Sequence, residues 1–134
     1  MANTILSNPR DFSDLDLNFT IHPIRKDINR HTGVQAVTNS IKNLLLTIYY
    51  ERPFHPEIGS NIRKMLFEPL DAIVAVDLQK EIEQTINNFE PRAKVSQIAV
   101  FPDFDRNGFR VDLKFIVINR TDPIQISFFL SRVR

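Results

Sequence analysis

Three acidic residues at predicted loops and helix ends are the first candidates for catalytic chemistry. They are Glu51, Glu57 and Glu68. Two carboxyl groups about 5 to 10 Å apart can hydrolyse a glycosidic bond, so a peptidoglycan hydrolase is one hypothesis. However, the sequence has no tryptophan on which a sugar could stack, and its 16 acidic residues form close pairs by chance. We therefore favour a protein that is not an enzyme.

Metal and cofactor chemistry has little support in the sequence. His22, His31 and His55 are scattered and lack the spacing of metal ligands. The chain has no cysteine, which excludes disulfides and thiolate ligands. Three glycines are too few for a phosphate-binding loop of backbone N–H groups, and no G-x-S-x-G or H-E-x-x-H motif is present. The sequence predicts no metal and no cofactor.

A short basic patch precedes the first predicted helix and raises the question of nucleic-acid binding. The patch consists of Arg25, Lys26, Arg30 and His31. Asp27 interrupts it, and it lacks the interleaved aromatic residues of a single-strand binder. The net charge of +1 adds no bias toward nucleic acid. We interpret the patch as a solvated turn and predict no nucleic-acid partner.

The sequence also gives no sign of a membrane partner or of export. No apolar stretch approaches the ~20 residues that cross a bilayer. The N-terminal segment "MANTILSNPRDF" has no basic region followed by an apolar run, so we predict no signal peptide. These observations favour a protein made in the cytoplasm.

The elements that would position any functional side chain form one predicted α+β domain, residues 1–134. Residues 1–18 are expected to be an extended arm, and "LNFTIHPI" at 17–24 predicts a short N-terminal strand that ends at Pro23. A helical half follows at 32–89 and a strand half at 94–131. The N-terminal helices are expected to pack against a C-terminal three-stranded antiparallel meander.

Three helices are predicted from caps and apolar periodicity. Thr32 and Gln35 match a capping box for the first, and Ser60 and Asp71 are candidate caps for the second and third. The predicted buried positions of the first helix are Val34, Val37, Ile41, Leu44, Leu45 and Ile48. Those of the second are Ile62, Met65 and Leu66. Those of the third, at 72–89, are Ala75, Leu78, Ile82, Ile86 and Phe89.

After Pro91 the apolar period changes from helical to alternating, which predicts strands. Residues 95–101 form the first, and Asn107-Gly108 is a hairpin turn signal. The second strand has a clean apolar face, which comprises Phe109, Val111, Leu113, Phe115 and Val117. The third repeats the alternation with Ile124, Ile126, Phe128 and Leu130.

Three motifs in this order resemble those of a known family over about residues 25–130. They are "GVQAVTNSIKNLLLT", "ERPFHPEIGSNIRKMLFEP" and the tripeptide "EPR" at 90–92, followed by alternating strands. The sequence is similar to the baseplate wedge proteins, or sheath initiators, of contractile-tailed bacteriophages, which have a counterpart in type VI secretion baseplates. The family was long labelled lysozyme-like. The present sequence departs from the family pattern at Tyr50, where family members frequently have a glycine.

The resemblance implies a structural protein of the virion tail baseplate, assembled in the host cytoplasm. It implies that the helical half packs on the helical core of the wedge, with Glu90, Pro91 and Arg92 at that contact. For the loop with Arg52 and Phe54 we predict a mainly intramolecular role, with part of its surface, through these two residues, in contact with a wedge neighbour. The neighbouring wedge proteins and the tail sheath protein are the expected partners, with tail tube or hub proteins as further ones. A type VI baseplate subunit of the same role is the alternative.

Local chemistry leaves other interpretations of these residues open. Pro91 ends the helix at Glu90, and Arg92 lies where it can approach the last helical carbonyls, so both charges could be capping and surface groups only. Phe54 could cover the core within the chain.

The resemblance further implies that the C-terminal strands accept strands of the first sheath ring and so template sheath assembly. We predict that the third strand is the site of this addition, through Ile124, Ile126, Phe128 and Phe129, because a meander leaves an open edge. Phe129 breaks the polar face of this strand, and packing under the N-terminal arm is the other explanation for it.

Overall fold

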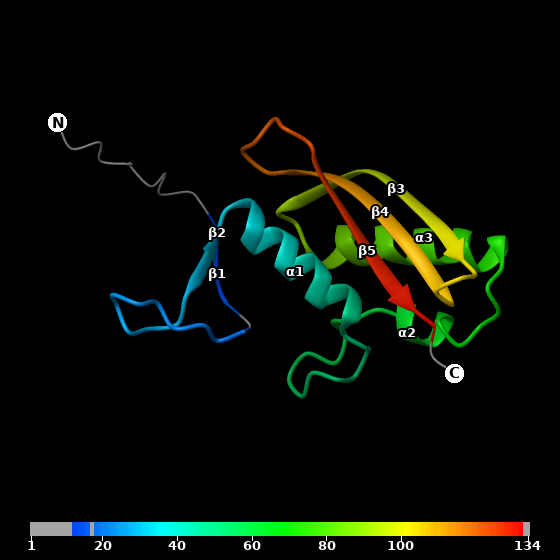
Figure 1. Cartoon of the computed structure of the whole chain (residues 1–134), viewed down its shortest axis with the longest axis horizontal. Helices are drawn as coiled ribbons and strands as arrows, with labels where there is room; N and C mark the ends of the chain where they lie inside the picture. The colour runs from blue at the N-terminus through cyan, green and yellow to red at the C-terminus, as the bar shows by residue number, and fades with distance from the viewer. Residues whose placement is uncertain (1–11, 17, 133–134) are drawn as a thin grey trace. The chain divides into compact units, whose positions relative to one another are not determined.

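The computed structural model describes residues 12–16 and 18–132, and the chain divides into two compact units, Met1–Asn39 and Ser40–Arg134. The boundary falls inside helix α1 (Val34–Leu46). The arm predicted at 1–18 lies mostly outside the described residues. Figure 1 shows the order of the elements along the chain.

The N-terminal unit contains a two-stranded antiparallel sheet of β1 (Ser13–Leu15) and β2 (Arg30–Thr32). The strand predicted at 17–24 is therefore misplaced. Within that range Ile21 makes only an isolated bridge with Ile28, and Leu17 lies outside the described residues. A short N-terminal strand exists, but it precedes the predicted one and pairs with a segment that sequence analysis treated as a turn.

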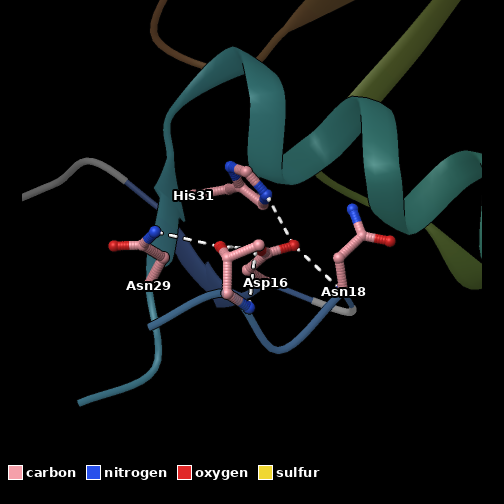
Figure 2. Close-up of polar contacts among 5 residues, drawn as sticks. Asp16, Asn18, Asn29 and His31 are labelled. Atoms are coloured by element: carbon pink, nitrogen blue, oxygen red, sulfur yellow. Dashed lines mark hydrogen bonds and ion pairs between the residues drawn. The ribbon is translucent and has the colours of Figure 1, made fainter. Parts of the chain in front are cut away.

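A polar cluster around Asp16 holds the segment that connects β1 to β2 (Figure 2). The Asp16 side chain is 5% exposed. Its carboxylate accepts hydrogen bonds from the Thr20 hydroxyl and the Asn18 N–H and lies 3.2 Å from His31 Nε2. Asn29 Nδ2 donates to the Thr20 hydroxyl oxygen at 3.0 Å. The Thr20 hydroxyl and the Asn18 N–H outweigh the effect of burial and lower the pKa of Asp16 to about 2.

Helix α1 begins without the predicted capping box. Thr32 pairs with Ser13 in the sheet, so it belongs to a strand and not to a helix cap. Gly33 then reverses the chain at a φ of 59°, a left-handed conformation that glycine adopts without a Cβ clash. Its carbonyl accepts from the Val37 N–H at 3.3 Å, and the helix proceeds from there.

The C-terminal unit is built on a sheet of strand order β3-β4-β5, which confirms the predicted antiparallel meander. Its strands are β3 (Ala93–Asp103), β4 (Gly108–Val117) and β5 (Ile124–Ser131). The predicted inner face of β4 is confirmed, because all five of its apolar side chains are at most 2% exposed. The hairpin between β3 and β4 turns at Asn107, whose φ of 53° is the left-handed conformation that asparagine tolerates.

Helix α3 (Ala72–Phe89) packs along the sheet and contacts mainly β3 (Figure 1). The Asp71 carboxylate accepts from the Ala72 N–H at 2.6 Å, which confirms the predicted cap. Four of the predicted inward positions, Ala75, Leu78, Ile82 and Ile86, are buried. Phe89 is only half-buried.

The short helix α2 (Ile62–Met65) lacks its predicted cap. Ser60 is buried and donates its hydroxyl to the Leu45 carbonyl at 2.8 Å, so it ties the chain to the end of α1. The Asn61 N–H instead donates to Glu81 Oε1 at 2.9 Å. Ile62 and Leu66 are buried as predicted.

Candidate partner-binding surfaces

The junction between α3 and β3 carries the tripeptide Glu90-Pro91-Arg92. The Glu90 N–H donates to the Ile86 carbonyl at 2.9 Å, which is the last helical bond, and Pro91 prevents the helix from continuing. The chain then turns into the sheet, where the Arg92 carbonyl accepts from the Ile118 N–H at 2.9 Å. The three residues therefore connect the helical half to the strand half.

Glu90 is a buried acid with its own counter-ion. Its side chain is 3% exposed. Arg92 binds it through two parallel bonds, from Nε to Oε1 at 2.6 Å and from Nη2 to Oε2 at 2.9 Å. The Ser40 hydroxyl of α1 also donates to Oε2. Burial raises the pKa of Glu90, but the bonds from Arg92 and Ser40 outweigh it, so the net pKa lies below the ordinary value.

This geometry separates the roles of the three residues. Glu90 faces inward and fixes the guanidinium of Arg92, whose side chain is 23% exposed. Pro91 is exposed. Pro91 and part of the Arg92 side chain are therefore accessible from solvent, whereas Glu90 lies beneath them. The interpretation of Glu90 as a surface charge is therefore wrong.

Sequence reasoning missed Ser40, the residue that completes this site. It precedes Glu90 by fifty positions and comes from a different helix. A serine on a predicted helix between apolar positions carries no local signal of a carboxylate partner, so only the tertiary structure identifies it.

The loop that follows α1 presents two of the predicted contact residues to solvent. Arg52 is exposed, and the Phe54 side chain is 90% exposed, so Phe54 does not cover the core. The base of the loop is fixed, because the Tyr50 N–H donates to the Pro56 carbonyl at 2.9 Å and the Ile48 N–H donates to Glu51 Oε2 at 2.9 Å. An aromatic side chain on a tied loop is a suitable anchor for a partner.

The three acidic residues considered for hydrolysis are all exposed. The Glu51 carboxylate accepts a hydrogen bond from the Ile48 N–H within the loop, and Glu68 is exposed. A backbone hydrogen bond and the His55 ring at 3.2 Å lower the pKa of Glu57. A general acid of a glycosidase needs a raised pKa, which is the opposite shift.

Strand β5 is an open edge of the C-terminal sheet, since among the described residues it pairs with β4 alone. The Arg132 N–H donates to the Asn107 carbonyl at 2.9 Å, on the β4 side. Backbone groups alternate in direction along an antiparallel strand, so the odd-numbered residues of β5 point theirs away from β4. The outward set is Gln125, Ser127, Phe129 and Ser131.

The side chains of β5 divide between the two faces of the sheet. Ile124, Ile126 and Phe128 lie opposite Phe115, Leu113 and Val111, so they share the buried face, but all three remain half-buried. Phe129 lies on the other face, where its ring is close to Gly108 and lies 6.0 Å from the Arg106 guanidinium. The alternative that Phe129 packs under the N-terminal arm concerns the arm predicted at 1–18, most of which lies outside the described part of the chain.

Strand β3 is the opposite edge and is less suited to accept a strand. Its register shifts between Val95 and Gln97, which places a bulge in the strand. Pro102 stands opposite Phe109, whose backbone groups face β5, so Pro102 lies where its missing N–H would have faced the free edge. Bulges and edge prolines are devices that discourage strand pairing. Strand β5 has neither.

Within residues 12–16 and 18–132, no three histidine or acidic side chains lie together in a way that could hold a metal ion. The helices of the same residues are too short or too polar to span a membrane.

Known proteins resemble this chain in both sequence and fold. A family model described as baseplate wedge protein gp25 matches residues 31–121. The baseplate wedge protein gp25 of Enterobacteria phage T4 is 31% identical over 114 residues, which cover 85% of this chain and 86% of that protein.

Three solved structures share the fold at lower identity. A chain of the anti-feeding prophage baseplate has a TM-score of 0.72 at 22% identity, covering 84% of this chain and 90% of that one. A putative tail lysozyme from Geobacter sulfurreducens has a TM-score of 0.69 at 17% identity, covering 75% and 91%. A chain of the postcontracted pyocin R2 baseplate has a TM-score of 0.54 at 21% identity, covering 90% and 100%.

Proposed function

Because the chain belongs to the baseplate wedge protein gp25 family, we propose that it is a structural subunit that initiates the sheath of a contractile tail. The resemblance predicted from the sequence motifs is thereby confirmed at the level of the family. In this proposal the chain is not an enzyme. It docks on neighbouring wedge proteins with one surface and accepts strands of the first sheath ring with another.

The observation that carries the sheath role is the asymmetry between the two sheet edges. Strand β5 offers a row of outward backbone donors and acceptors, uninterrupted by a bulge or a proline. An extended segment of the sheath protein adds to this edge by main-chain hydrogen bonds. The half-buried side chains of Ile124, Ile126 and Phe128 then gain cover from the added strand, and Phe129 contacts it on the other face.

The wedge-docking role rests on the exposed parts of two segments. Pro91 and the edge of Arg92 form one contact, and Arg52 with Phe54 forms the other. Glu90 contributes indirectly, by holding the Arg92 guanidinium in one orientation.

We place this subunit in the baseplate of a phage virion, after assembly in the host cytoplasm. The curated relative from phage T4 and the "RPFHPEIG" segment support a phage rather than a type VI secretion system. Other wedge proteins and the sheath protein are the proposed partners, with tail tube or hub proteins as further neighbours. A type VI baseplate would use the same surfaces.

The sheath role is tested with two proline substitutions in β5, which remove backbone N–H groups that point in opposite directions. Gln125→Pro removes an outward N–H and leaves the bonds to β4 intact, because proline is tolerated on an edge strand that faces solvent. Gln125→Ala keeps that N–H and is the matched control. Ile126→Pro removes an inward N–H and should lower the melting temperature.

The expected result is that Gln125→Pro baseplates contain the subunit but carry no sheath in electron micrographs, whereas Gln125→Ala baseplates carry normal sheaths. Normal sheath growth on Gln125→Pro baseplates would rule out this edge.

The docking role is tested with exposed residues, whose substitution leaves the fold intact. Phe54→Ala and Arg52→Glu should both reduce capture of the purified wedge proteins by the tagged chain. Arg120→Glu, an exposed arginine on the turn after β4, is the control and should not. Equal capture by all variants would exclude the loop as a docking surface.

A further inference from the structure

An apolar groove of about 380 Å³ lies in the C-terminal unit between β5 and the segment from the end of α1 to α2. Its lining comes from α1, from α2 with the residue that follows it, and from β5, and comprises Leu45, Leu46, Ile62, Arg63, Leu66, Phe129, Leu130 and Ser131. The proposed sheath and wedge contacts assign no role to the α1 and α2 residues of this set. The size is near the lower end of small-molecule pockets, which suits one or two side chains better than a whole ligand.

The groove continues the open edge of β5. The last three residues of that strand line it, and the backbone groups of Phe129 and Ser131 point outward. A strand that adds to β5 therefore passes along the groove as it reaches the C-terminal end of β5. The residue of the added strand that stands opposite Leu130 projects its side chain from the same sheet face as Leu130, because paired residues share a face.

We propose that this groove is the specificity pocket for the added strand. It receives a large aliphatic or aromatic side chain from the position opposite Leu130, and Arg63 pairs with a carboxylate of the same segment. This inference rests on the strand-addition function proposed above and adds the chemistry that the partner segment must carry. Backbone pairing along β5 sets the direction of that segment, and the groove sets its register.

The exposure of Leu46 supports the proposal that an apolar side chain occupies the groove. This last residue of α1 is 64% exposed, although it lines the groove beside the buried Leu45 and Ile62. Each Å² of apolar surface removed from water contributes about 25 cal/mol. An apolar side chain in the groove would cover Leu46, whereas a slip by one residue would turn that side chain to the other face of the sheet.

The charged half follows from Arg63. In the described part of the chain no ion pair involves Arg63, and its neighbour Lys64 is also exposed and basic. A guanidinium at the edge of an apolar groove favours a carboxylate over other anions of a peptide, because its planar N–H groups match the two carboxylate oxygens. The partner segment is therefore an apolar and acidic strand.

The test measures binding of purified sheath subunits of the same tail to immobilised wedges that contain the full-length chain. Leu46→Glu places a charge in the groove, and Arg63→Glu reverses the charge at its edge. Ile118→Glu, at a 49% exposed apolar site on the turn after β4, and Lys64→Glu are the matched controls. Gln125→Pro tests the strand edge in parallel, and melting curves verify the fold of every variant.

The two groove variants should act on different rate constants. Leu46→Glu should speed dissociation roughly tenfold or more, since a change in an apolar pocket is worth about 10- to 200-fold. Arg63→Glu should slow association several-fold at low salt and flatten its salt dependence, as edge charges do. Both controls should bind as the wild type does.

The outcomes separate this inference from the proposed function. If Gln125→Pro abolishes binding and both groove variants bind normally, the strand edge is used and the groove is not, which overturns the inference alone. If Gln125→Pro binds normally, strand addition to β5 fails and the groove inference fails with it. Groove variants no weaker than their controls contradict the proposal in either case.

Discussion

The substitution Arg92→Ala tests whether the Glu90–Arg92 pair holds the junction between α3 and β3. It removes two hydrogen bonds of 2.6 and 2.9 Å to the Glu90 carboxylate and leaves the Ser40 hydroxyl as the donor from α1. The carboxylate itself stays where it is, at 3% exposure. The variant therefore contains a buried charge that has lost its counter-ion.

The magnitude follows from the burial of the two partners. Breaking a fully buried pair costs roughly 3–5 kcal/mol. The Arg92 side chain is 23% exposed, so water can replace part of what the guanidinium supplied. We expect a loss of about 2–3 kcal/mol at pH 7, which corresponds to a melting temperature lower by roughly 6–15 °C for a chain of this size.

The same substitution has a pH signature of known sign. In the wild type the folded-state pKa of Glu90 is lowered, so its contribution to stability is present above pH 4.5 and is lost as the pH falls through the folded pKa. In Arg92→Ala burial acts without the arginine and raises the folded pKa. As the pH falls toward the pKa of Glu90 in the unfolded chain, protonation of the buried carboxylate removes this destabilisation of the variant. The melting temperatures of the wild type and of Arg92→Ala therefore converge.

The assay is thermal unfolding followed by circular dichroism between pH 7 and pH 4, with Arg120→Ala as the control for loss of an exposed arginine. Removing an exposed charge is expected to cost about 0–1 kcal/mol. The buried-pair account would be refuted if Arg92→Ala lowered the melting temperature at pH 7 no more than Arg120→Ala does. It would also be refuted if the difference in melting temperature between wild type and Arg92→Ala stayed constant down to pH 4. Capture of wedge proteins by Arg92→Ala must be compared below its melting temperature, because the substitution affects both the fold and the contact.

Three further predictions concern other sites. Asp16→Asn should make the stability of the N-terminal unit less dependent on pH. In the wild type the stabilisation is present above pH 3.8 and is lost as the pH falls toward 2, which amide exchange in β1 and β2 would report. Gly59→Ala should cost roughly 1–3 kcal/mol or more in urea unfolding, because a Cβ there would lie 2.6 Å from the Tyr49 backbone nitrogen. Phe54→Ala should change the free energy of unfolding by less than about 0.5 kcal/mol, since the side chain is 90% exposed, and a larger loss in urea unfolding would show that Phe54 packs within the chain.

Periodicity and local caps predicted most of the C-terminal unit. The alternation in β4 identified all five buried side chains, and Asp71 marked the start of α3, because these signals depend on residues close in sequence. The strand order followed as well, since the short turns left a meander as the simplest arrangement.

The predictions from sequence were wrong where a side chain or strand residue bonds to a partner that is far away in the sequence. Thr32 was expected to cap a helix, but it pairs with Ser13 in a sheet. Ser60 was expected to cap α2, but its hydroxyl bonds to the Leu45 carbonyl. Glu90 was open to interpretation as a surface charge because nothing near it in sequence indicates burial. Its partner Ser40 lies on another helix, and sequence patterns carry no such contact.

The unequal edges of the C-terminal sheet also determine how isolated copies of this chain can associate. Pairing of one β5 with another is isologous: a two-fold axis relates the copies, each consumes its partner's open edge, and growth stops at a dimer. Pairing of β5 with the β3 of the next copy would be heterologous and would extend into a fibre. Pro102 and the β3 bulge disfavour that second arrangement. In the proposed function, the same difference between the edges leaves β5 open to the sheath protein and disfavours fibre growth by unassembled subunits.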